Sequence, residues 1–62
     1  MIISIGYDAA TSTLEIEFKS DGAVWQYFDV PENVYLDMMS AESQGRFWHA
    51  VIKKQYAESR VG

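Results

Sequence analysis

Hydrophobic and polar residues alternate along the first half of the chain, which is the pattern of half-buried β-strands. The alternation is clearest over residues 13–19, whose apolar members on one face are Leu14, Ile16 and Phe18. It recurs over residues 3–8 and, with fewer polar interruptions, over residues 24–30. The small and polar residues 8–12 are typical of a hairpin loop. These runs predict a three-stranded antiparallel meander.

The turn between the second and third strands decides on which face the rings of Trp25 and Tyr27 lie. Residues 21–22, an Asp-Gly pair, are a strong signal for a two-residue hairpin turn. In that register Phe18 faces Trp25 and Ile16 faces Tyr27, so both rings share the core face. A three-residue loop with a bulge would shift the pairing by one residue and expose both rings. We favour the core register.

After Pro31 the spacing of apolar residues becomes helical. Proline suits a first helical turn, so a short helix is expected over residues 31–40. Ser43 can cap a second helix, expected to run to about Ser59. Its apolar side comprises Phe47, Trp48, Val51, Ile52 and Tyr56. The order of elements predicts an α+β domain, with a three-stranded antiparallel meander followed by two short helices packed on one face.

Size and composition limit the architecture further. The chain has 62 residues, 48% of them hydrophobic and 15% aromatic, which predicts one folded domain over residues 1–62. A chain this short buries only about 60% of its unfolded surface, so its stability alone is marginal and a homo-oligomer is expected. No apolar run reaches the ~18 residues of a membrane span, and the start lacks the basic region of a signal peptide. We therefore expect no membrane partner and a cytoplasmic location.

Charge is unevenly distributed along a chain whose net charge is −4. Residues 1–31 carry five carboxylates and one lysine, whereas residues 32–62 carry four carboxylates and four basic side chains. On a continuous second helix, an arc of about 60° would hold a basic stripe of Arg46, His49, Lys53 and Arg60. Such a stripe could follow a phosphate backbone, with the rings of Trp48 and Tyr56 beside it for stacking. The alternative is an ordinary solvated helix face.

Aromatic residues are more numerous than a core of this size easily buries, so some are expected at a groove or an interface. In the favoured register Phe28 lies on the outer face of the sheet with Val24 and Val30. A row of exposed apolar groups there would mark a partner surface, and the candidate interaction surface comprises Val24, Phe28 and Trp48. The first strand also leaves an edge through which two copies could join.

Few residues could carry catalysis. The chain has one histidine and no cysteine, which excludes a Cys–His pair and a thiolate or multi-histidine metal site within one chain. Ser43 is interpreted as a helix cap, and Glu15 and Glu17 as the solvated side of a strand that also carries Lys19. We predict no enzymatic activity, no metal site, no cofactor and no small-molecule substrate.

Several short segments also form a recognisable series when their order and spacing are taken together. The series consists of Gly6-Tyr7-Asp8, Leu14-x-Ile16-x-Phe18, Gly22, Trp25-x-Tyr27, Val30-Pro31, Tyr35, Ala41-x-Ser43-x-Gly45, Phe47, Ile52 and Tyr56. Over nearly the whole chain it resembles the KTSC domain, a bacterial module named after the C-terminal piece of some lysyl-tRNA synthetases. The resemblance implies no established activity, but the association with a tRNA-handling enzyme implies RNA as a ligand. The family-motif aromatics, expected to be structural, are Tyr7, Trp25, Tyr27 and Tyr56.

Two functions remain open. The first is a non-catalytic binding module that contacts RNA, or less readily DNA, through the basic stripe. The alternative is a protein-interaction or self-association module without a nucleic-acid role. It would use the outer face of the sheet around Phe28, and its partner would be a second copy of the chain or a larger protein assembly.

Overall fold

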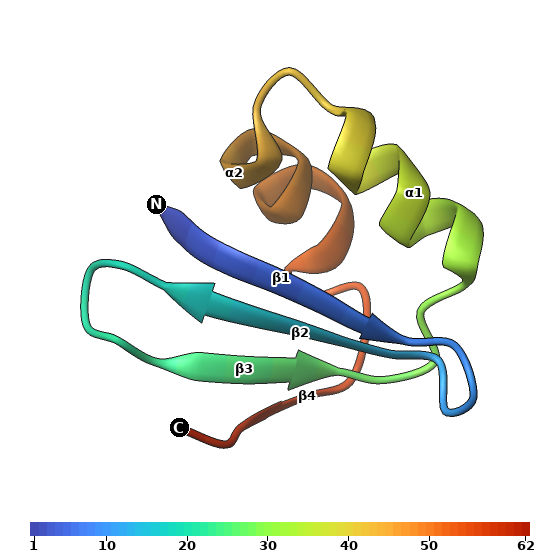
Figure 1. Cartoon of the computed structure of the whole chain (residues 1–62), viewed down its shortest axis with the longest axis horizontal. Coiled ribbons are helices and arrows are strands. Elements are labelled where there is room, and N and C mark those ends of the chain that lie inside the picture. The colour runs from blue at the N-terminus through green and yellow to red at the C-terminus, as the bar shows by residue number, and fades with distance from the viewer.

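The computed structural model describes residues 1–62, and it consists of one antiparallel sheet with helices on one of its faces (Figure 1). The strands lie in the order β1-β2-β3-β4 and comprise β1 (Ile2–Asp8), β2 (Thr13–Phe18), β3 (Val24–Tyr27) and β4 (Glu58–Arg60). The helical elements are α1 (Glu32–Ser40), α2 (Gln44–Phe47) and the π-helical turn η1 (Trp48–Ile52), which continues α2. The predicted α+β class, the meander of β1 to β3 and the two helices are confirmed. None of the helices has the length and apolar content needed to cross a membrane.

The loop between β2 and β3 comprises residues 19–23 and is longer than the predicted two-residue turn. Gly22 adopts the left-handed region there, with a φ of 68°. Tyr27 consequently opposes Leu14, not Ile16, and the predicted register is wrong by two residues. A shift by an even number leaves every side chain on its original face. The prediction that both aromatic residues of β3 share the core face is therefore confirmed.

The core lies between the sheet and the helices. Its fully buried members are Leu14, Ile16, Tyr27, Val30, Met38 and Ile52. Val30 was predicted on the outer face, and that prediction is wrong. Asp29 adopts the left-handed region, with a φ of 58°, so the alternation of β3 stops there and Val30 turns inward.

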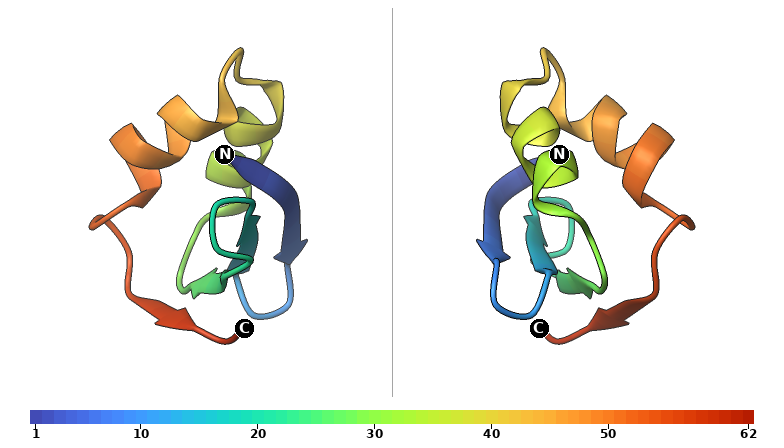
Figure 2. Two further views of the ribbon diagram at one scale, coloured as in Figure 1. Left: turned by 90° about the vertical axis from the view of Figure 1, so that its left-hand side faces the viewer. Right: turned by 90° about the vertical axis from the view of Figure 1, so that its right-hand side faces the viewer.

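The second helix is much shorter than predicted. The side chain of Ser43 accepts a hydrogen bond of 3.2 Å from the backbone nitrogen of Arg46, which confirms the predicted cap. The helix then widens into η1 and ends at Ile52, because Lys53 is extended and Lys54 has a φ of 66°. The chain stands away from the sheet after η1 and returns to pair with β3 as β4 (Figure 2).

Two tyrosines join the end of β1 to α1. The rings of Tyr7 and Tyr35 stack with their centroids 4.8 Å apart. The Tyr7 hydroxyl donates a hydrogen bond of 2.6 Å to the backbone oxygen of Val30. Both interactions support the expectation that Tyr7 is structural.

Two adjacent methionines of α1 lie on opposite sides of the boundary of the core. Met38 is fully buried, whereas Met39 is 44% exposed. We expect Met38→Ala to lower the free energy of unfolding by about 2–5 kcal/mol, because the deletion leaves a cavity. Met39→Ala is the matched control and should change it by less than about 0.5 kcal/mol. Urea denaturation followed by tryptophan fluorescence measures both, and equal losses would contradict the placement of α1.

Candidate functional site

A pocket of about 210 Å³ lies where β3, η1 and β4 meet. We call it the aromatic pocket, and its lining residues are Trp25, Tyr27, Trp48, Lys53, Lys54 and Glu58. Two of these residues come from β3 and one begins η1. The other three come from the segment that leaves η1 and rejoins the sheet. The pocket therefore depends on the same chain reversal that ends the helix.

The wall of the pocket is held by Trp48. Its indole Nε1–H donates a hydrogen bond of 2.9 Å to the hydroxyl oxygen of Tyr27. Its ring packs edge-on against Phe18, with the centroids 4.9 Å apart. These contacts attach η1 to the sheet and restrict the orientation of the indole ring.

Tyr27 lines the pocket, and only 1% of the residue is exposed. Burial raises the pKa of Tyr27 above its ordinary value of 10.0, the hydrogen bond from Trp48 opposes the rise, and the carboxylate of Glu58 adds to it. The phenol is therefore neutral at physiological pH. Its oxygen accepts from Trp48.

The rim of the pocket carries opposite charges. The Lys53 ammonium lies 5.4 Å from the centre of the Trp48 ring, within the range of a cation–π interaction. Lys54 adds a second ammonium, and Glu58 adds one carboxylate. Two cations against one anion make this rim basic on a chain whose net charge is −4.

The basic stripe predicted on the second helix does not form as one helix face. Arg46 and His49 are exposed on α2 and η1, whereas Lys53 lines the aromatic pocket. Arg60 lies on β4 opposite Trp25, and its Nε donates a hydrogen bond of 2.9 Å to the backbone oxygen of Gly62. The helix ends before Lys53, so helical spacing no longer relates these residues.

The predicted interaction surface is only partly exposed. Val24, Phe28 and Trp48 are each half-buried, and Val24 lies in close contact with Gly62 at the chain end. The exposed large hydrophobic side chains are Met1, Ile3, Leu36, Met39 and Val61. Of these, Val61 lies beside Val24, whose backbone oxygen accepts from its backbone nitrogen. Gln26, which pairs with Glu15, separates Val24 from Phe28, so the predicted apolar row on the outer face is interrupted.

Sequence reasoning missed Lys54 and Glu58 as pocket residues and gave Trp25 and Tyr27 only a structural role. The weak signal that was available is the end of the apolar helical spacing at Tyr56. The next helical positions, 59 and 60, are polar, which is consistent with a shorter helix. Nothing in that pattern indicates the return to β3.

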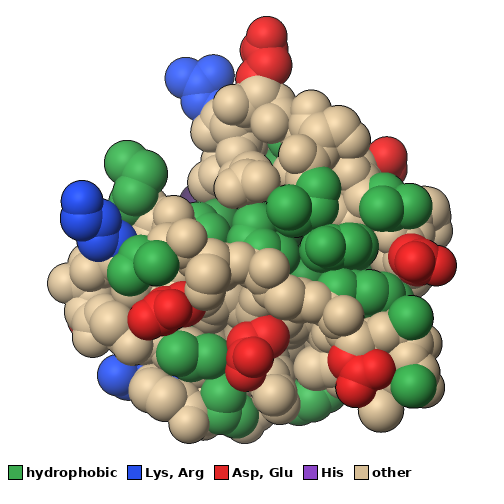
Figure 3. Space-filling model, in the orientation of Figure 1, with side chains coloured by type: hydrophobic (Ala, Val, Ile, Leu, Met, Phe, Trp, Pro, Cys, Tyr) green, Lys and Arg blue, Asp and Glu red, His purple; other side chains and the backbone are tan.

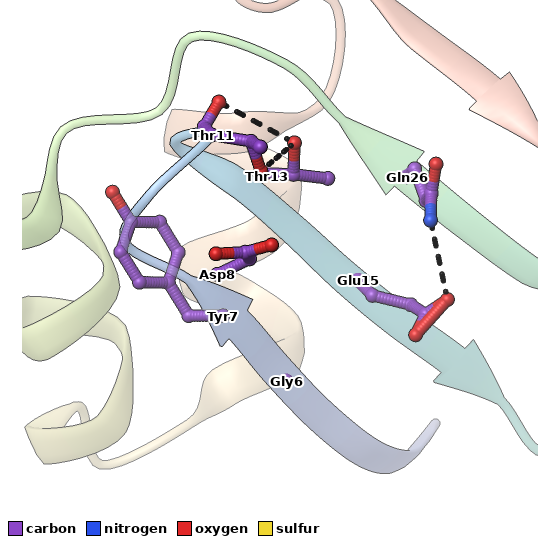
Figure 4. Close-up of a pocket in the computed structure, with 7 residues that line it drawn as sticks. All are labelled: Gly6, Tyr7, Asp8, Thr11, Thr13, Glu15 and Gln26. Carbon is purple, nitrogen blue, oxygen red and sulfur yellow. Dashed lines mark hydrogen bonds between the residues drawn. The ribbon is translucent and has the colours of Figure 1, made fainter.

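A second, larger hollow of about 490 Å³ lies on the outer face of the sheet (Figure 4). Its polar side chains bond to one another: Gln26 reaches Glu15 at 3.5 Å, and Thr11 reaches Thr13 at 3.0 Å. Glu15 and Glu17 project from this outer face, since their neighbours Leu14 and Ile16 are buried in the core. Figure 3 shows acidic side chains spread over one side of the molecule, with Lys and Arg side chains toward its left edge. The outer face of the sheet repels polyanions, so the aromatic pocket on the opposite face is the better candidate for a binding site.

The fold and the pocket define a small α+β domain with one aromatic site between its sheet and its second helix. The model of the KTSC domain matches residues 1–56, and the chain belongs to this family. A KTSC domain protein of Yersinia pestis, solved by crystallography, superposes with a TM-score of 0.93 at 44% identity, covering 98% of this chain and 84% of its own. The expected resemblance is thus confirmed.

The chain matches most of the length of one further relative and a small part of another. A protein of Tsukamurella paurometabola is 38% identical over 55 residues, which cover 89% of this chain and 81% of that protein. A lysine–tRNA ligase of a Nostoc species is 40% identical over 50 residues, which cover 81% of this chain and 9% of the ligase. The domain therefore occurs both in small proteins and within a much longer enzyme.

The burial of Tyr27 predicts a pH dependence of stability. Because its pKa is raised on folding, the folded chain holds the phenolic proton more tightly than the unfolded chain. This contribution to stability is complete below pH 10.0 and is lost as the pH rises through the folded-state pKa. Urea denaturation between about pH 9 and pH 11 should show a steeper loss in the wild type than in Tyr27→Phe. Parallel losses would contradict the burial of this hydroxyl.

Proposed function

We propose that the domain is a non-catalytic module that binds single-stranded RNA through the aromatic pocket. The observation that carries this proposal is the presence of two tryptophan rings and two lysines in one pocket. Rings bind unpaired bases by stacking, and ammonium groups bind the phosphates beside them. A duplex hides its base faces, so single strands, loops and ends are the ligands that suit this arrangement.

The rings have different roles in this proposal. Lys53 already lies over the face of Trp48, and Phe18 packs against its edge. Trp25 is half-buried and lines the pocket, so it is the ring on which a base stacks. Stacking of one base on an aromatic side chain contributes about 1–3 kcal/mol to binding.

The lysines supply the electrostatic part of the binding. Each ammonium that contacts a phosphate releases condensed counterions, which makes the affinity depend on salt. Two such groups give few contacts, so one domain binds weakly and acts best within a larger assembly. Glu15 and Glu17 on the outer face of the sheet repel phosphates, which favours approach of the strand to the aromatic pocket.

The relatives also support RNA as the ligand. One of them is a lysine–tRNA ligase, and the matched region is a small part of that enzyme. A module joined to a tRNA-handling enzyme raises the local concentration of its active site on RNA if the module itself binds RNA. This chain uses the same fold, and by the proposal it uses the same type of contact.

Charge removal at the pocket tests the proposal. Lys53→Gln and Lys54→Gln each keep most of the side-chain stem and remove one ammonium. We expect each variant to bind a single-stranded RNA dodecamer more weakly at about 50 mM salt. Each should also reduce the slope of log affinity against log salt by about 0.7. Fluorescence anisotropy of labelled RNA measures both quantities.

The matched control is Lys19→Gln, which removes an exposed lysine from the β2–β3 loop. It should leave the slope unchanged, because Lys19 is outside the pocket. The proposal fails if the wild type does not bind RNA at about 50 mM salt, where phosphate contacts are strong. It also fails if the control changes the slope as much as the pocket variants do.

A further inference from the structure

Glu58 is an unexpected residue in a pocket proposed to bind a polyanion. It opposes Tyr27 across β3 and β4, and opposed residues of an antiparallel pair project to the same face. It lines the pocket together with both lysines, and its charge influences the Tyr27 hydroxyl. A carboxylate there repels phosphate, so it must face a part of the ligand that donates hydrogen bonds.

The accessible polar group at this end of the pocket is the exposed carboxylate of Glu58. It has two oxygens and only accepts hydrogen bonds. A ligand edge that complements it has two adjacent donors.

Among the four RNA bases, guanine has this edge. Its O6 is an acceptor, and N1–H and the N2 amino group are donors that lie side by side. Adenine and cytosine place a ring acceptor beside their single amino group, where it would face the carboxylate. Uracil has one donor between two acceptors. A bidentate pair with a carboxylate therefore forms with guanine alone.

The size of the pocket agrees with one base. Its volume of about 210 Å³ is below the ~300–1,000 Å³ of pockets that hold drug-sized ligands. A base stacked on Trp25 can turn its edge toward β4, because Arg60 and Glu58 continue the same strand beside the ring. Its phosphate then remains at the rim with Lys53 and Lys54.

We propose that the aromatic pocket selects an unpaired guanine, with Glu58 as the specificity-determining residue. This inference rests on the proposed function, since it names the base that the RNA site prefers. Glu58 accepts from N1–H and N2–H of the base. Each good bidentate pair discriminates against the wrong base, so the preference for guanine should be about tenfold or more.

The test uses four RNA undecamers of uridine that carry guanine, adenine, cytosine or uridine at the centre. Anisotropy titrations with the wild type should give the highest affinity for the guanine undecamer. In Glu58→Gln the amide nitrogen would face the guanine donors, so the preference should disappear. Removal of the negative charge should also strengthen binding of the all-uridine undecamer, which a merely structural role of Glu58 would not do.

Glu42→Gln is the matched control, because it removes an exposed carboxylate outside the pocket. It should keep the preference for guanine. Equal affinities of the wild type for the four undecamers would overturn the guanine site and leave RNA binding intact. An undiminished preference in Glu58→Gln would also overturn it. A failure to bind any undecamer would overturn the proposed function as well.

Discussion

The pairing of β4 with β3 is the interaction on which the site depends. Without it β3 would be an edge strand whose outer backbone groups lack partners. The last residues supply those partners: Phe28 donates to Ala57, and Val24 exchanges hydrogen bonds with Gly62. To reach this edge the chain must leave the helix early. That reversal carries the lysines and Glu58 over the aromatic residues of β3, so one topological requirement creates both the sheet and the aromatic pocket.

The π-helical turn η1 sets the direction in which the Trp48 side chain points. Its closing hydrogen bond runs from the backbone nitrogen of Lys53 to the backbone oxygen of Trp48 over 2.8 Å. A turn of this type adds one residue relative to an α-helix and changes the directions of the side chains that follow. Here it coincides with Trp48, whose indole bonds to Tyr27. The hydrogen bond and the wide turn together hold the ring at the wall of the pocket.

Local patterns predicted most of the fold. Period-two alternation identified β1 to β3, and the cap at Ser43 marked the start of the second helix, because these signals depend on neighbouring residues. The end of that helix did not follow from the sequence. Residues 53–60 are helix-compatible in composition, and only a partner distant in sequence, the edge of β3, makes the extended conformation favourable. For this reason the predicted basic stripe does not form as one helix face. For the same reason Lys54 and Glu58 were not predicted as pocket residues.

If RNA binds in the aromatic pocket, the nuclei of that pocket must respond to it. The decisive measurement is nitrogen–proton NMR of the isotope-labelled domain during titration with a short guanine-containing single strand. We expect the largest shifts at the indole N–H signals of Trp25 and Trp48 and at the backbone amides of residues 53–58. Shifts confined to β1, α1 or the outer face of the sheet, with both indole signals unmoved, would show that RNA does not bind in this pocket.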